Sequence, residues 1–147
     1  MNKKVNLEEI LLDGFQLVRR SFFEKGTEPA LSISNGTLAF NSACGKALNC
    51  CESVQVLVNN NDKKIIITPV TSNEVEAVKW KKAKCDAYKL DCMSFIKCLF
   101  ETWKYDVKLR YRGIGRIVQS NGKIMILFDF SKPEIWEGKK LVSKYEE

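Results

Sequence analysis

Residues 108–126 of the chain read KLRYRGIGRIVQSNGKIMI, two runs of β-forming residues on either side of Asn121-Gly122. Asn-Gly supplies the positive φ values of a type I′ turn, so this stretch predicts a β-hairpin. Asn35-Gly36 separates a second pair of apolar runs, and the polar residues 59–62 separate a third pair, rich in β-branched side chains. Three hairpins in 147 residues predict an antiparallel, sheet-rich fold.

Helices are fewer in this pattern. Residues 93–103 predict the clearest one, because apolar side chains recur there on a single face, namely Ile96, Leu99, Phe100 and Trp103. Shorter helices are predicted over residues 42–48, over residues 6–12, where Asn6 and Glu9 form a capping box, and around residues 135–136. Residues 14–23 fit a helix and a strand equally well.

The predicted elements repeat along the chain. Two segments, about residues 29–70 and 86–130, each read as strand, helix, strand, turn, strand, with a basic linker over residues 71–85. Neither half is long enough to bury a core alone, so we predict an α+β single domain over residues 1–147 with an internal βαββ duplication. A chance likeness of the two stretches is the alternative. The expected common core contains Leu38, Leu48, Val56, Ile66, Leu90, Leu99, Leu109 and Ile126.

Composition excludes several classes of protein. Hydrophobic residues make up 45% of the chain and charged residues 29%, which is typical of a soluble globule. No apolar run approaches the roughly 18 residues that a membrane-spanning helix needs. The residues after Met1 lead into acidic Glu8 and Glu9 instead of an apolar signal core, so we expect a cytoplasmic protein without membrane contact. The chain has no histidine, which excludes every catalytic triad that needs an imidazole.

Six cysteines lie at positions 44, 50, 51, 85, 92 and 98. No Cys-x-x-Cys occurs, and the spacing fits no zinc ribbon. Cys44, Cys92 and Cys98 have apolar neighbours, so we expect reduced and mostly buried thiols. A four-thiolate zinc site built from distant segments stays open as an alternative, but we predict neither a metal nor another cofactor.

The net charge of +6 is concentrated in one third of the chain. Residues 79–123 contain twelve Lys or Arg against four acidic residues, whereas the flanking segments are nearly balanced. A concentrated positive field attracts polyanions such as nucleic acids. A solvated basic face without a partner is the plainer interpretation.

The candidate binding residues lie within this basic third. Side chains alternate between the two faces of a strand, so Lys108, Arg110, Arg112 and Arg116 are expected on one exposed face. Leu109, Tyr111 and Ile117 are expected on the other. Together with Lys79, Lys81, Lys82 and Lys84 around Trp80, these cations predict one phosphate-binding surface. The alternative is an edge strand whose charges prevent aggregation.

No motif points to catalysis. Gly113-x-Gly115 lies inside a strand pattern and lacks the third glycine of a dinucleotide fingerprint. Asp86, Asp91, Asp106 and Asp129 are scattered, as expected for caps, turns and exposed strand positions. We therefore predict no catalytic residues and a protein that is not an enzyme.

Two families resemble parts of this sequence. Residues 40–48, 53–58 and 64–69 resemble the swapped-hairpin unit of AbrB- and MraZ-type regulators, with Asn41 in place of the family's proline. That resemblance implies a DNA-linked role. Over most of its length, the chain also resembles uncharacterised proteins from prophages and integrative elements of clostridia-like bacteria. The matching pieces include Phe40-Asn41-x-Ala43-Cys44, Tyr111-Arg112-x-x-Gly115-Arg116 and Ser120-Asn121-Gly122. The second resemblance implies a mobile-element context and no particular activity.

Together these patterns predict a non-enzymatic DNA-binding or regulatory protein of a mobile genetic element. It would contact phosphates through the basic strand face and bind DNA with little sequence specificity. The alternative is a protein–protein interaction module that does not bind nucleic acid, with a partner encoded by the same element. The sequence does not predict an oligomeric state.

Overall fold

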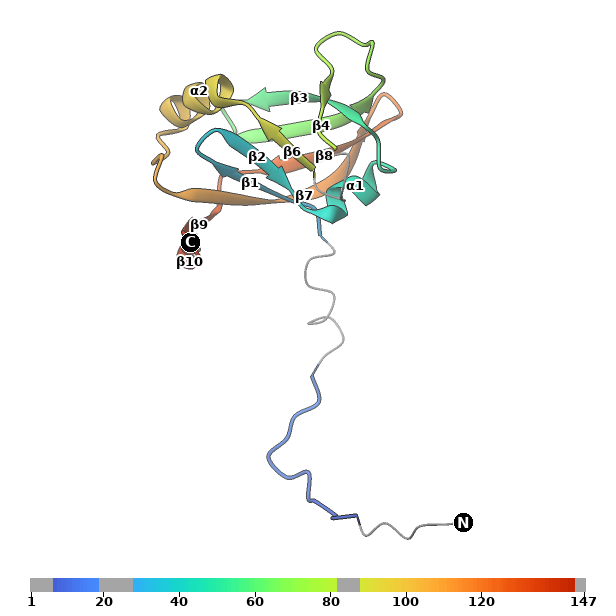
Figure 1. Cartoon of the computed structure of the whole chain (residues 1–147), viewed down its shortest axis with the longest axis vertical. Coiled ribbons are helices and arrows are strands. Elements are labelled where there is room, and N and C mark those ends of the chain that lie inside the picture. Colours follow the sequence, from blue (N-terminus) through green and yellow to red (C-terminus); the bar gives the residue numbers. More distant parts are fainter. Residues whose placement is uncertain (1–6, 19–27, 82–87, 145–147) are drawn as a thin grey trace.

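A computed structural model describes residues 7–18, 28–81 and 88–144 of the chain (Figure 1). Its elements, in chain order, are β1 (Ala30–Ser34), β2 (Thr37–Phe40), α1 (Ser42–Ala47), β3 (Ser53–Asn59), β4 (Lys64–Val70), β5 (Val78–Lys79), β6 (Tyr88–Asp91), α2 (Met93–Trp103), β7 (Arg110–Ser120), β8 (Lys123–Asp129), β9 (Glu134–Glu137) and β10 (Lys140–Lys144).

The strands form one antiparallel, barrel-like sheet. Its order is β5-β3-β4-β8-β7-β1-β2-β6, and β9 and β10 extend it at the side of β7. The two ends of this order meet where Lys81 bridges Tyr88 and the Lys89 N–H donates to the Trp80 carbonyl at 2.8 Å, so the barrel is nearly closed. The two helices lie at opposite ends of the barrel (Figure 1). Over the described ranges, the fold is therefore a mostly-sheet antiparallel domain with two helices.

The predicted hairpins are confirmed. Asn121 and Gly122, with φ values of 52° and 77°, form the turn between β7 and β8. In the β1–β2 turn only Gly36 has a positive φ, 87°, so this turn is not of the predicted type I′. Residues 60–63 connect β3 to β4.

Strand pairing follows a two-fold pattern. We call β1 to β4 with α1 the first half, and β5 to β8 with α2 the second half. If β1 is exchanged with β5, β2 with β6, β3 with β7 and β4 with β8, the order of the strands around the barrel stays the same. Where β4 meets β8, buried residues of the two halves lie opposite one another in the pairs Ile65–Phe128 and Ile67–Ile126. The predicted βαββ order therefore occurs in both halves.

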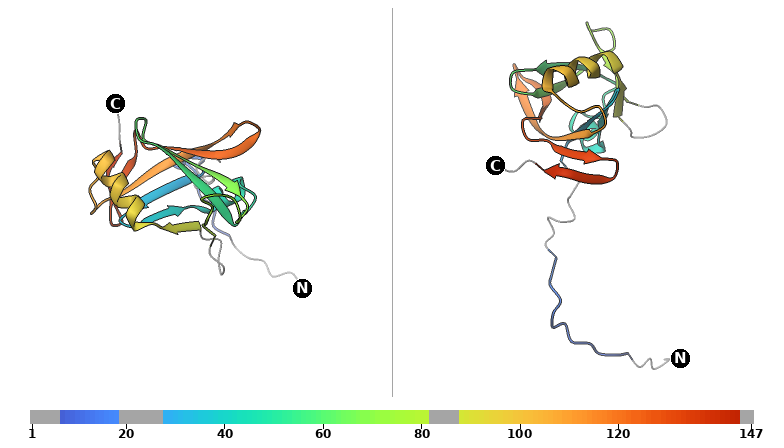
Figure 2. Two further views of the ribbon diagram at one scale, coloured as in Figure 1. Left: turned by 90° about the horizontal axis from the view of Figure 1, so that it is seen from above. Right: turned by 90° about the vertical axis from the view of Figure 1, so that its left-hand side faces the viewer.

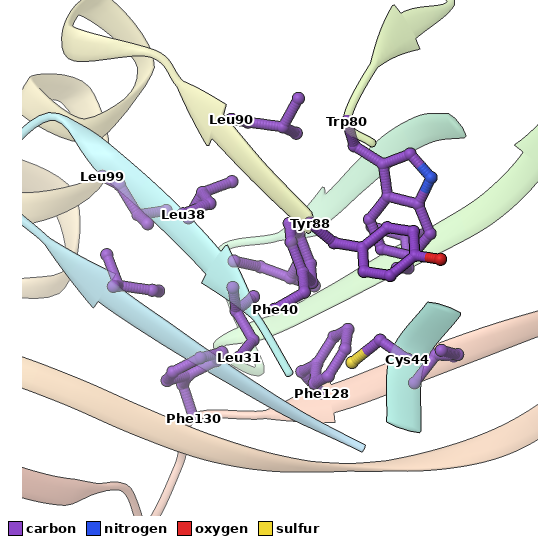
Figure 3. Packing of buried hydrophobic residues seen from close by; sticks show 14 of the residues in the cluster. Leu31, Leu38, Phe40, Cys44, Trp80, Tyr88, Leu90, Leu99, Phe128 and Phe130 are labelled. Carbon is purple, nitrogen blue, oxygen red and sulfur yellow. The ribbon is translucent and has the colours of Figure 1, made fainter. Parts of the chain in front are cut away.

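One cluster of buried side chains fills the barrel and takes residues from both halves (Figure 3). Phe40 packs edge-on against Trp80 at 5.1 Å, and Tyr88 lies 4.5 Å from the same indole. Five residues of the predicted core are buried in this cluster: Leu38, Leu48, Leu90, Leu99 and Ile126. Val56 and Leu109 are partly buried against it. The predicted burial of Ile66 in the core is wrong. Its neighbours Ile65 and Ile67 point inward, so Ile66 lies on the outer face of the strand.

Helix α2 has the predicted bounds and buried face, and α1 occupies most of residues 42–48. The helix predicted over residues 6–12 is not found within its described part, residues 7–12. That segment packs against no core, and a short isolated helix is marginal in water. The helix predicted around Ile135 and Trp136 is also wrong. These residues form β9, which pairs with β7 (Figure 2), so tertiary pairing overrides the local pattern.

Candidate functional site

The predicted basic residues do not gather on one surface. Lys82 and Lys84 lie outside the described residues. Lys79 belongs to β5 and Lys81 follows it, whereas Arg110, Arg112 and Arg116 belong to β7. Three strands separate β5 from β7 in either direction around the barrel, so these two groups lie on opposite walls. The basic third of the sequence wraps around the fold, which disperses its charge.

Within β7 the predicted alternation is present. Arg110, Arg112 and Arg116 lie on the outer face of the strand, while Tyr111 and the two glycines between the arginines are buried. Lys108 is exposed in the turn that precedes the strand. Ile117 was expected to face the core but is 58% exposed, because this end of β7 extends beyond the barrel wall formed with β1.

Two of the arginines make contacts within the chain. The Arg110 guanidinium lies over the Trp136 ring, 5.4 Å from its centroid. Arg112 Nη1 lies 3.4 Å from Glu134 Oε2, and both side chains are less than one-third exposed. Both partners belong to β9, whose pairing with β7 places them directly opposite these arginines. These contacts could not be predicted from the sequence, because the local pattern around Ile135 and Trp136 predicts a helix.

A different feature lies on the outer face of the sheet formed by β3, β4, β8 and β7. Leu57 pairs with Ile66, Ile66 pairs with Leu127, and Leu127 pairs with Arg116. Directly paired residues project from the same face, so the three aliphatic side chains form a continuous row that ends at an arginine. We call Leu57, Ile66 and Leu127 the outer apolar row. Outward positions of a solvated antiparallel sheet are normally polar.

Charged side chains flank this row. Lys64 pairs with Asp129 two residues along the strands from the Ile66–Leu127 pair, and therefore on the same face of the sheet. Burial raises the pKa of Asp129, but hydrogen bonds from Ser131 and the charges of Lys64 and Arg116 outweigh it and lower the pKa below its usual value. The Ser131 hydroxyl donates to Asp129 Oδ1 at 2.7 Å. The row is thus bordered by an ionised carboxylate and two cations.

The cysteines that the structure describes differ in burial. Burial raises the pKa of Cys44 to about 11, so this thiol is protonated at neutral pH. Cys92 is half-buried, whereas Cys98 is exposed on α2, contrary to its predicted burial. Cys85 lies outside the described residues. Within the described ranges, no three His, Cys, Asp or Glu side chains are grouped so that they could hold a metal ion.

None of the helices in the described part of the chain is long and apolar enough to cross a membrane. Comparison with known proteins gives no match to a family model, a curated protein or a solved structure.

Proposed function

We propose that this protein is a non-enzymatic interaction module that binds a partner protein through the outer apolar row. The observation that carries the proposal is the alignment of Leu57, Ile66 and Leu127 in register across three adjacent strands. Leu57 is 46% exposed and the other two are half-buried, so water contacts aliphatic surface at the centre of a sheet face. Contiguous exposed apolar surface on a folded domain marks an interaction site.

The partner's chemistry follows from the surroundings of the row. A complementary surface has an aliphatic or aromatic centre to cover the three side chains and an acidic group to meet Arg116. Ile66 and Leu127 lie on strands that are paired on both sides, and Leu57 is paired with β4, so little order has to be gained on binding. By the resemblance to mobile-element proteins, the partner would be a cytoplasmic protein encoded by the same element.

Substitution of one row residue tests this function. Leu57→Asp should weaken capture of the partner at least about tenfold, since hydrophobic hot spots cost 2 kcal/mol or more when lost. Ile124→Asp is the matched control, because Ile124 is also 46% exposed but projects from the opposite face of the sheet. Both variants should melt within a few degrees of the wild type. Equal loss of binding in both variants would exclude the outer apolar row as the docking surface.

DNA binding through the outer face of β7 is the second candidate. It is favoured by Arg110, Arg112 and Arg116, which occupy alternate outward positions together with exposed Ile114. Arg116→Ala should reduce the slope of log affinity against log salt by about one, equally for unrelated sequences. Lys140→Ala, on β10, should do far less. Absence of wild-type binding at roughly 50 mM salt, where phosphate contacts are strong, would end this candidate.

We also propose that the two halves arose by duplication of one unit. The supporting observation is that the order of strands around the barrel survives their exchange. The proposal predicts that side-chain pairs can be moved between equivalent positions of the halves.

A further inference from the structure

A groove of about 450 Å³ opens in the barrel wall between β3 and β6. Its apolar lining includes Val56, Val58, Val78, Leu90 and Phe95. Val54, Val56 and Val58 share one face of β3, but their exposure rises from 0% at Val54 to 41% at Val58. The core-facing side of β3 is therefore uncovered towards the end of the strand.

Both walls of the groove are open strand edges. β3 pairs with β4 along its whole length, but on its other edge it pairs with β5 only at Ser53 and Val54. β6 pairs with β2 along its whole length, and within the described residues its other edge is bonded at Tyr88, bridged by Lys81, and at Lys89, whose N–H donates to the Trp80 carbonyl, but not at Leu90 or Asp91. Open edges offer unpaired backbone N–H and C=O groups to an added strand.

The first half shows how the equivalent space is filled. There β1 runs between β7 and β2 and pairs with both. Asn41, the N-cap of α1, holds the chain that enters β1, because its side chain accepts from the Ala30 N–H and donates to the Glu28 carbonyl. The N-cap of α2 is Cys92, which makes no side-chain cap hydrogen bond. The chain that enters β5 lacks this attachment, and the groove lies beside it.

The described N-terminal residues carry apolar side chains that are exposed to solvent. Residues 7–18 expose seven of them: Leu7, Ile10, Leu11, Leu12, Phe15, Leu17 and Val18, each at least 54% exposed. The segment also carries three acidic residues and no cation. At the groove, Lys79 and Lys89 provide positive charge, and Lys89 pairs with Asp91 at 3.7 Å.

We propose that residues 7–12 of the same chain bind in this groove as an added strand along the open edge of β3. Apolar side chains would cover Val56 and Val58, and Glu8 or Glu9 would approach Lys79 or Lys89. Residues 7–12 are not helical in the structure, so an extended bound form needs no helix to unfold.

The connection is long enough for this docking. Ala30 and the groove are separated by roughly 15–20 Å, which is two strand spacings and a few residues of strand rise. The eleven residues between Val18 and Ala30 can span up to roughly 36 Å. A tethered segment has an effective concentration in the millimolar range, so the same chain competes better than a second copy at micromolar protein.

Hydrogen exchange on the full chain tests the docking. Wild-type amides of residues 8–12 and 56–58 should exchange more slowly than in the double variant Ile10→Asp/Leu11→Asp, by about fivefold or more. Val58→Asp should accelerate exchange of residues 8–12 by a similar factor, because coupling between two sites is reciprocal. Leu57→Asp is the matched control. It alters the neighbouring residue on the opposite face of β3, in the outer apolar row, and should leave residues 8–12 unchanged.

Two results would overturn the inference. One is exchange of residues 8–12 at the rate of an unstructured peptide in the wild type. The other is protection that rises with protein concentration, which would assign the groove to a second copy. Neither result bears on partner binding by the outer apolar row, so the two proposals fail separately.

Discussion

The two halves of the barrel share a frame of strand pairs but fill it with different side chains. In the first half β1 has five residues and buries Ala30, Leu31 and Ile33. In the second half β5 has two residues, and the chain beside it is anchored by Trp80, which is fully buried. The two halves therefore share the position of this strand in the sheet, but they differ in its length. The groove lies in the half with the shorter strand.

The two halves also divide side-chain volume differently within corresponding strand pairs, β3–β4 and β7–β8. Val56 lies opposite Ile67 in the first half, and Gly115 lies opposite Phe128 in the second. A Cβ atom on Gly115 would come within 2.7 Å of the Phe128 ring and within 2.8 Å of Ile126 Cγ2, so both neighbours require the glycine. Interiors are close-packed, and a gain on one side of such a pair needs a loss on the other.

Removing the anchor of β5 should have the largest effect. Trp80→Ala deletes a fully buried indole that packs against Phe40 and Tyr88 and donates to the Cys51 carbonyl at 2.8 Å. We expect the free energy of unfolding to fall by about 3–5 kcal/mol, measured by urea denaturation. Trp136→Ala, at a half-buried site on β9, is the control and should cost much less. Similar losses in the two variants would mean that Trp80 does not close the barrel.

Moving a pair between halves should have the next largest effect. Gly115→Val alone overpacks the core and should cost about 3 kcal/mol. Gly115→Val combined with Phe128→Ile recreates the pair of the first half and should recover the part of that loss that comes from the Phe128 ring, while the contact with Ile126 remains. Denaturant midpoints of the two single variants and the double variant give the coupling energy. Strictly additive losses would contradict the equivalence of these positions.

Much of the fold follows from local patterns, but its closure does not. Asn-Gly turns and the apolar face of α2 are encoded within a few residues, so the hairpins and α2 could be predicted. The run Lys64-Ile65-Ile66-Ile67 is apolar on both faces, so alternation could not identify the inward side. β9 exists through pairing with a distant strand, and its local sequence did not indicate this.

The candidate site was predictable only in part. Alternation along β7 placed three arginines on one face, but only the closed sheet shows that Lys79 lies on the opposite wall. The outer apolar row has one signal in the sequence, which is that β4 and β8 carry aliphatic residues at both inward and outward positions. Such strands are either buried on both faces or cover a partner.

The N-caps of the two helices should give a smaller difference. Asn41→Ala removes the hydrogen bonds to the Cys44 and Ala30 amides and to the Glu28 carbonyl, so we expect a loss of about 1–2 kcal/mol. Thermal melting with denaturant titration measures it, and the effect should be accompanied by faster exchange of the β1 amides. A loss without faster exchange there would separate the cap from the attachment of β1.

Transferring this cap to the second half should be mildly stabilising. Cys92→Asn gives α2 a side-chain acceptor at its N-cap and should raise the free energy of unfolding by about 0.5–1 kcal/mol. Cys92→Ala serves as the baseline, since it removes the thiol without adding a cap. An asparagine variant no more stable than the alanine variant would show that the two N-caps are not interchangeable.

The smallest effect is expected at the contact between β7 and β9, a strand that belongs to neither half. Glu134→Gln weakens the ion pair with Arg112 and should cost about 0.5 kcal/mol or less at low salt. The difference from the wild type should shrink in about 1 M salt, where the Debye length is roughly 3 Å. A salt-independent loss would point to packing of β9 instead of charge.

The interleaving of the halves has a consequence for biosynthesis. β4 has β8 as its second partner, β2 has β6 and β1 has β7, so three of the four first-half strands complete their pairing only with residues that are made later. About sixty residues separate the end of β4 from the end of β8, which is roughly 3–12 s of translation at 5–20 residues per second. During that interval the nascent first half has apolar strand edges and no sheet to join. We expect its yield on expression to depend on chaperones that hold the nascent chain until β8 has left the ribosome.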